Sequence, residues 1–224
     1  MIETRTQARV ARTLVALTLL LLVSCVGTHR LSDPTLVLNT SQGTELGVST
    51  EYGVIFLGHT ARSGDVEITA WYGDGPSIES TVIEPINAQL FTAETEIRLP
   101  SVPMTFVEPL PGQEVVVIGR RGSKKWEKRL NVLSDPRVEG ILLGVPSELQ
   151  NAPDQIGAGV FICPDGDCKR KQFLGLVSGQ ITLDGEGGRR TYLSVIGPSE
   201  LWPLVTHRRD LNRRKPWVYR DDIL

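Results

Sequence analysis

The sequence predicts an all-β protein built as an antiparallel barrel or sandwich, and two observations support this fold class. Short runs rich in β-branched and other apolar residues recur about every 10 residues, separated by Gly- and Pro-rich clusters such as 73–76, 109–112 and 184–188. After residue 25, no apolar stripe of helical spacing continues beyond two turns. Evenly spaced short strands with this punctuation are typical of antiparallel sandwiches and barrels.

The overall composition limits the classes of function. The 224 residues are 40% apolar and 22% charged, and the formal net charge is -2. This composition excludes collagen and low-complexity disorder, and the chain lacks the basic field that a nucleic-acid-binding protein uses. We therefore expect a folded protein without a nucleic-acid partner.

Residues 1–24 have the features of a bacterial lipoprotein signal peptide. Three arginines precede an apolar run of 11 residues at 13–23, which is shorter than the roughly 20 residues that span a bilayer and suits a secretory signal. Residues 22–25 (LVSC) resemble the lipobox, which implies cleavage before Cys25 and lipidation of its sulfur. We expect a membrane partner through this anchor in the bacterial cell envelope, at the periplasmic face of the outer membrane if the cell is Gram-negative, because Val26 is not Asp. A plain signal peptide with an incidental Cys25 is the alternative.

The mature chain is expected to have three parts. Residues 25–50 form a lipid tether and a first strand at 36–38, residues 51–206 form the β domain, and residues 207–224 form a basic tail with a net charge of +3. We expect this tail to lie on the domain or to contact anionic headgroups. A helix is expected to begin near residue 198 with Ser199 as its N-cap. The remaining expected strands are 52–57, 66–72, 80–86, 94–99, 114–118, 126–133, 140–143, 159–163, 173–178 and 191–196.

Two cysteines of the β domain are expected to form a disulfide. Cys163 and Cys168 flank the turn sequence Pro164-Asp-Gly, and an exported protein is exposed to an oxidising compartment. A metal site that uses Asp165 and Asp167 is the alternative, but it lacks further ligands nearby. With three His in the chain and no HExxH-like pair, we expect no metal and no cofactor.

Several segments resemble landmarks of trypsin-like serine proteases. Residues 157–161 (GAGVF), the Cys-bridged hairpin and residues 173–179 (FLGLVSG) resemble the strands that follow the family's nucleophile loop. Residues 111–119 (PGQEVVVIG) are similar to the strand that opens the second barrel. The resemblance implies two six-stranded antiparallel β-barrels followed by a short C-terminal helix.

Upstream segments follow in the family's order and allow the catalytic positions to be carried over. Residues 53–59 (GVIFLGH) place His59 at the catalytic His, and residues 94–100 (ETEIRLP) place Ala93 or Glu94 at the catalytic Asp. Counting back from Val160 places Ile156 at the nucleophile. An isoleucine has no lone pair with which to attack a carbonyl.

The resemblance therefore implies a protease fold with a degenerate catalytic site. No Ser lies between Ser147 and Ser178, so a slipped register does not supply the nucleophile. We expect a lipid-anchored module that binds a peptide or protein partner, or acts as a scaffold, without cutting it. The alternatives are an active serine endopeptidase with a rearranged site and an unrelated β-barrel or sandwich lipoprotein. The basic segment 120–129 is either a solvated hairpin or a grip for a polyanion, and the sequence does not predict an oligomeric state.

Overall fold

The computed structural model describes residues 34–60, 64–69, 78–95, 99–122, 124–145, 155–185 and 188–204. Within these ranges, residues 64, 65, 69, 78–84, 94 and 95 are described by their place in a strand and not by their side chains. The expected signal peptide, Cys25 and the basic tail lie outside the described residues. Within the described residues, no helix has the length and apolarity needed to span a membrane.

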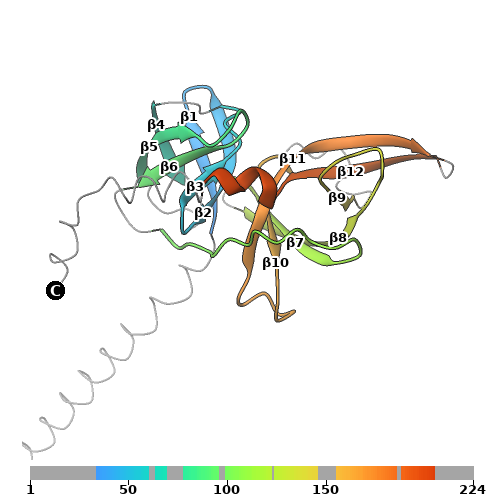
Figure 1. Ribbon diagram of the computed structural model, residues 1–224. Helices are drawn as coiled ribbons and strands as arrows, with labels where there is room; N and C mark the ends of the chain where they lie inside the picture. Colours follow the sequence, from blue (N-terminus) through green and yellow to red (C-terminus); the bar gives the residue numbers. More distant parts are fainter. Residues whose placement is uncertain are drawn as a thin grey trace, which may run out of the picture. The chain divides into compact units, whose positions relative to one another are not determined.

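The first six strands close into an antiparallel barrel (Figure 1). Around the barrel the strand order is β1-β2-β3-β6-β5-β4, and β4 pairs back onto β1. The strands are β1 (Thr35–Thr40), β2 (Gly43–Thr50), β3 (Gly53–Phe56), β4 (Gly64–Thr69), β5 (Ile78–Pro85) and β6 (Phe91–Thr95).

The next six strands close into a second antiparallel barrel. Their order is β10-β11-β12-β9-β8-β7, and β10 pairs with β7 to complete the ring. Figure 1 shows β11 and β12 as a long hairpin, and β9 pairs with only its Tyr192–Val195 part. The strands are β7 (Glu114–Arg121), β8 (Lys124–Leu133), β9 (Ile141–Gly144), β10 (Gly159–Ile162), β11 (Gln172–Gly185) and β12 (Gly188–Ile196). The predicted fold, two six-stranded barrels followed by a short C-terminal helix, is confirmed.

Strand β7 contributes to two different cores. Val115 and Val117 point into the second barrel, where they join a buried cluster with residues of β8 to β12. Val116 and Ile118 point the other way, into a cluster that also contains Val48 of the first barrel. Because alternate residues of a strand face opposite sides, this one strand serves both the barrel interior and the contact between the barrels.

A buried arginine adds a polar contact between the barrels. Arg120, on β7, is 5% exposed, and its Nε donates a hydrogen bond to the carbonyl oxygen of Thr35 at 2.9 Å. Thr35 is the first residue of β1. The start of the first barrel is thus attached to the strand that opens the second.

The first barrel begins earlier than the sequence predicted. Residues 25–50 were expected to form a lipid tether and a first strand at 36–38, and this strand is observed as β1. The whole of β2 also lies in the barrel, and Leu36, Leu38 and Val48 are fully buried. The Thr and Ser residues here resemble a linker in composition, yet Thr is β-branched and fits a strand well. The boundary expected at residue 51 is therefore wrong, since the barrel begins at Thr35.

Two further expectations are corrected by local structure. The strand expected at 94–99 is β6, at Phe91–Thr95, because Asn87 forms the turn that starts it. The helix starts at residue 198, so its N-cap is Gly197 rather than Ser199. Pro198 then occupies the first helical position, and the Glu200 carboxylate accepts the Gly197 N–H at 3.1 Å, as in a capping box.

Candidate functional site

The turn that carries Ile156 is held by backbone hydrogen bonds and by close packing. The Ala158 N–H donates to Gln155 O at 3.0 Å, and the Gly157 N–H donates to Val177 O at 2.8 Å on β11. Gly157 has φ +81°, and a Cβ there would lie 3.0 Å from the carbonyl oxygen of Leu46. Only glycine fits both the backbone angle and the approach to β2.

Ile156 sits at the surface of this turn. Its side chain is 41% exposed, although it is a large hydrophobic residue. The exposed hydrocarbon stands at the position that the family resemblance assigns to the nucleophile, and it can neither give up a proton nor attack a carbonyl.

Gln155, the residue before it, is 1% exposed and anchors the turn from inside. Its Oε1 accepts a hydrogen bond from Gln180 Nε2 at 3.1 Å. Gln180 lies on β11, so the turn is tied to this strand by a side-chain contact as well as by the backbone of Gly157. The turn therefore has a defined shape, and its residues 155–158 (QIGA) contain no serine.

His59 follows the end of β3 and is exposed. Its backbone N–H donates to Glu45 Oε2 at 3.0 Å, and both the N–H and the hydroxyl of Thr60 donate to Glu45 Oε1. Gly58, with φ +67°, lets the chain pass over the ring of Phe91, which leaves no room for a Cβ. The position of His59 is therefore set by its backbone and by the largely buried Glu45 carboxylate.

Strand β2 brings the His59 turn and the Ile156 turn to one place. Gly157 packs on the backbone of Leu46, and the His59 backbone binds the side chain of Glu45. Leu46 and Glu45 are consecutive residues of β2. Two of the three expected catalytic positions thus meet through neighbouring contacts on a single strand.

Glu94 is not brought to this place. In the β3–β6 pair, Phe56 lies opposite Phe91 and Val54 opposite Ala93. Glu94 therefore continues toward the start of β3, about 10 Å along the strand from Phe91 at roughly 3.4 Å per residue. His59 follows Phe56 in the opposite direction, so the register keeps the two positions at opposite ends of the strand pair.

The His59 end of β6 is occupied by a turn that the sequence reasoning missed. Asn87 Oδ1 accepts the N–H groups of Gln89 at 2.8 Å and Leu90 at 2.9 Å, and Asn87 Nδ2 donates to Glu200 O at 3.2 Å. Residues 86–90 (INAQL) contain no carboxylate. The available signal was Asn87 itself, since Asn commonly binds its own backbone at turns.

The serine closest along the chain after the Ile156 turn is already engaged. Ser178 Oγ donates to the carbonyl oxygen of Ser194 at 3.1 Å, and the side chain is partly buried. Ser178 sits at the irregularity between Val177 and Gly179, where β11 shifts its register with β12. Its hydroxyl therefore links β11 to β12 by one hydrogen bond.

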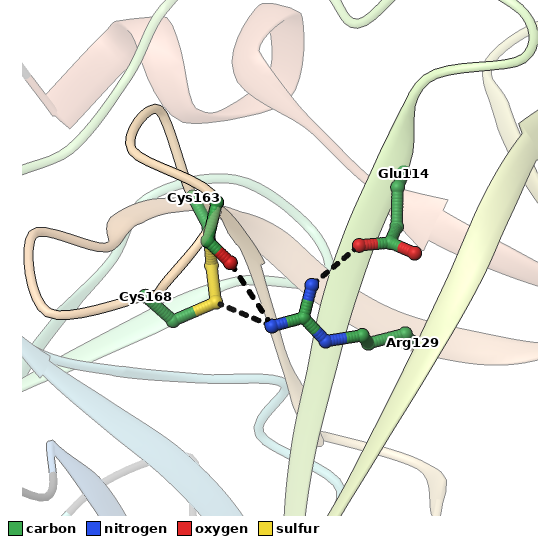
Figure 2. A network of polar contacts seen from close by, with 5 residues as sticks. Glu114, Arg129, Cys163 and Cys168 are labelled. Atoms are coloured by element: carbon green, nitrogen blue, oxygen red, sulfur yellow. Dashed lines mark hydrogen bonds and ion pairs between the residues drawn. A yellow bond between two sulfur atoms is a disulfide. The ribbon is translucent and has the colours of Figure 1, made fainter.

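The disulfide predicted between Cys163 and Cys168 is confirmed, with an S–S distance of 2.09 Å. It closes the loop between β10 and β11, and Figure 2 shows Arg129 of β8 beside it. Arg129 donates to Gly166 O at 3.1 Å and to Cys168 Sγ at 3.7 Å, and it forms an ion pair with Glu114 at 2.6 Å. Within the described ranges, no group of three or more His, Cys, Asp or Glu residues is arranged to hold a metal ion.

Comparison with known proteins identifies the fold. No protein-family model and no curated protein sequence matches the chain. Among solved structures, the MamO protease domain from Magnetospirillum magneticum superposes with a TM-score of 0.52 and 16% identity, covering 80% of this chain and 97% of that one. The active form of the Rv3671c protease from M. tuberculosis gives 0.56 and 16%, covering 83% and 85%.

Two further structures agree with this result. The inactive form of Rv3671c gives a TM-score of 0.55 and 17% identity over 78% of this chain and 88% of that one. A serine endoprotease from Yersinia pestis gives 0.55 and 14%, covering 83% of this chain and 65% of that one. At these identities the likeness shows the fold alone, and the fold is that of the trypsin-like serine proteases.

Proposed function

We propose that this protein is an exported, lipid-anchored binding module that uses a catalytically inactive trypsin-like fold to hold extended peptide segments. The observation that carries the proposal is Ile156, exposed on the ordered turn before β10. A trypsin-like enzyme needs a hydroxyl there and a His to take its proton. The chain retains the turn and His59 but lacks the hydroxyl.

The strand register supports the loss of chemistry. A catalytic His needs a carboxylate that orients its ring. Glu94 lies at the far end of the β3–β6 pair, and residues 86–90 at the near end contain neither Asp nor Glu. The proposal therefore rests on two observations, the lack of a hydroxyl at position 156 and the lack of a carboxylate in residues 86–90, and not on Ile156 alone.

The edge of β11 supports peptide binding. Over Gln172–Leu176 this strand pairs with β10, and its pairing with β12 begins at Leu176. From residue 178 to residue 185 its strand partner within the described chain is β12 alone. Such an edge can accept one more strand through backbone hydrogen bonds. It begins next to the Ile156 turn, since Val177 exchanges hydrogen bonds with Gly157 and Ala158.

The test of inactivity is labelling of the purified full chain with a fluorophosphonate, in parallel with a His59→Ala variant. We expect no serine to be labelled in either protein, because within the described residues no serine hydroxyl is hydrogen-bonded to the imidazole of His59. Labelling of the parent that His59→Ala abolishes would instead establish the active serine endopeptidase with a rearranged site.

The test of binding is hydrogen exchange with a library of extended peptides. A bound strand should slow the exchange of the β11 amides between residues 178 and 185 and leave those of β8 unchanged. Peptides that bind without slowing exchange on β11 would contradict strand addition while leaving the loss of catalysis standing.

A further inference from the structure

A groove separate from the Ile156 turn lies where the segment joining the two barrels meets the second barrel. Its volume is about 400 Å³, and it is walled by Glu108, Pro109 and Pro111, by the loop after β8 and by the first turn of the helix at 198. Val132, Ile141 and Val195 line its floor, and the exposed side chain of Leu133 adds apolar surface on one wall. Apolar groups of another segment can be covered here.

Exposed apolar side chains occur on the elements that line this groove, and one of them, Leu133, lines the groove itself. The large hydrophobic residues with exposed side chains in the described part of the chain are Val107, Leu110, Leu133, Ile156 and Trp202. All except Ile156 lie on the joining segment, at the end of β8 or on the helix. Trp202 also packs edge-on against Phe106, with ring centroids 5.4 Å apart. Clustered exposed apolar residues mark surfaces that bind another chain segment.

The groove is acidic. Four carboxylates line it, those of Glu108, Asp135, Glu139 and Glu200, and no Lys, Arg or His does. Asp135 is paired with Arg137, and Glu200 caps Gly197. The side chains of Glu108 and Glu139 have no hydrogen-bond or ion-pair partner among the described residues. Two negative charges therefore remain uncompensated beside an apolar floor.

The chain itself contains a segment of matching chemistry. Residues 205–224 carry six cations, at positions 208, 209, 213, 214, 215 and 220, against three Asp, and they also contain Leu211, Trp217 and Tyr219. They follow directly on the helix whose first turn walls the groove. A tethered segment reaches its site at an effective concentration on the order of millimolar.

We propose that residues 205–224 dock into this groove in the same molecule, placing basic side chains beside Glu108 and Glu139 and apolar ones on the floor. The inference is independent of the proposed loss of catalysis. It assigns the basic tail to the surface of the domain rather than to anionic lipid headgroups.

The first test is zero-length carbodiimide coupling on the purified full chain in non-ionic detergent, followed by peptide mass spectrometry. Lys215 is the tail's only lysine, and it should couple to Glu108 or Glu139. Coupling of Lys215 only to carboxylates outside the groove, or to none, would overturn the proposal.

The second test measures how fast trypsin cuts at the tail arginines of the full chain. Docking protects these sites, so the double variant Glu108→Gln/Glu139→Gln should be cut about three- to tenfold faster, the range expected for losing one or two exposed ion pairs. Glu67→Gln, at an exposed position on β4, is the matched control and should be cut at the parent's rate. Equal rates for parent and double variant would contradict docking.

Anionic vesicles distinguish the remaining alternative. Vesicles containing one fifth phosphatidylglycerol are added to the parent and to the double variant. Protection of the tail that appears only with vesicles, and equally in both proteins, would assign it to the membrane and reject the groove. Protection of the parent without vesicles supports the groove.

Discussion

The carboxylate of Glu45 accepts the backbone N–H of His59 at 3.0 Å, and its other oxygen accepts both the N–H and the hydroxyl of Thr60. Glu45 is only 9% exposed. The turn after β3 is thus organised by a carboxylate that binds backbone groups, and this structural role does not depend on any chemistry at the imidazole.

Replacing Glu45 should therefore destabilise the fold. In Glu45→Gln the amide keeps one acceptor oxygen and turns an NH₂ toward donors, so we expect a loss of about 1–3 kcal/mol in the free energy of unfolding. Denaturant unfolding of parent and variant measures it. Glu67→Gln, at an exposed position, should leave the midpoint unchanged, and a variant of Glu45 as stable as the parent would contradict the assigned role.

Gly157→Ala should cost more stability than Gly112→Ala. Both glycines have positive φ, +81° and +86°, so both substitutions strain the backbone by about 1–3 kcal/mol. Only at Gly157 does the added methyl group also meet Leu46, whereas nothing lies within 4 Å at Gly112. The difference between the two unfolding midpoints isolates the packing of the Ile156 turn on β2, and equal losses would show that this contact contributes nothing.

Introducing a hydroxyl at position 156 should not produce serine-hydrolase activity. We expect Ile156→Ser to remain unlabelled by a fluorophosphonate, because the near end of β6 carries no carboxylate to orient His59. Labelling is followed by gel fluorescence, with trypsin as the positive control. Rapid labelling at position 156 would show that the serine alone had been missing.

Membrane attachment should depend on the sulfur of Cys25, the expected site of lipidation. Cys25→Ala removes the acceptor of the lipid, and the acyl chains hold the protein by about 0.8 kcal/mol per buried CH₂. In a detergent phase partition the parent should enter the detergent phase and the variant the aqueous phase. Equal partition of the two proteins would reject the lipoprotein assignment.

The Asp135–Arg137 pair should make stability depend on pH in the acid range. The side-chain hydrogen bond from Arg137 is the main cause that lowers the pKa of Asp135 from 3.8 to about 2. Because the folded pKa lies below the unfolded one, the contribution is complete above about pH 4 and is lost as the pH falls toward 2. Melting temperatures of parent and Asp135→Asn should converge over that interval, and a constant difference down to pH 2 would contradict the pairing.

Much of the fold could be predicted because alternation and turn residues are local signals. In the second barrel, β7 to β10 were predicted well, since residues 115–118 are a continuous apolar run and turn residues separate the strands. The β11–β12 hairpin was underestimated, because β11 continues to Gly185 rather than ending at 178 and β12 starts at Gly188 rather than 191. Strand β2 was missed because Gly43–Thr50 is rich in Gly, Ser and Thr, and its Val48 is buried by residues distant in sequence, such as Val116 and Ile118 of β7.

The candidate site could be predicted only where a residue is fixed by the strand that follows it. Ile156 was placed by counting back from Val160, and the structure starts β10 at Gly159, directly after the turn that carries Ile156. Its assignment to the nucleophile position stays a prediction. Glu94 was placed by similarity alone, and the turn at Asn87 moved β6 toward the N-terminus. The contact of Glu45 with His59 joins β2 to the turn after the neighbouring strand β3, and it leaves no local signature in the sequence.

The two faces of β7 also bear on which substitutions the chain can accept over time. Residues 115–118 are all at least 99% buried, two in each of the two cores, whereas β8 alternates between buried and exposed positions over its second half. A strand with one solvated face can accept polar and apolar substitutions at every second residue. Residues 115–118 of β7 include no solvated position. Its neutral variation is confined to exchanges among apolar residues of similar volume.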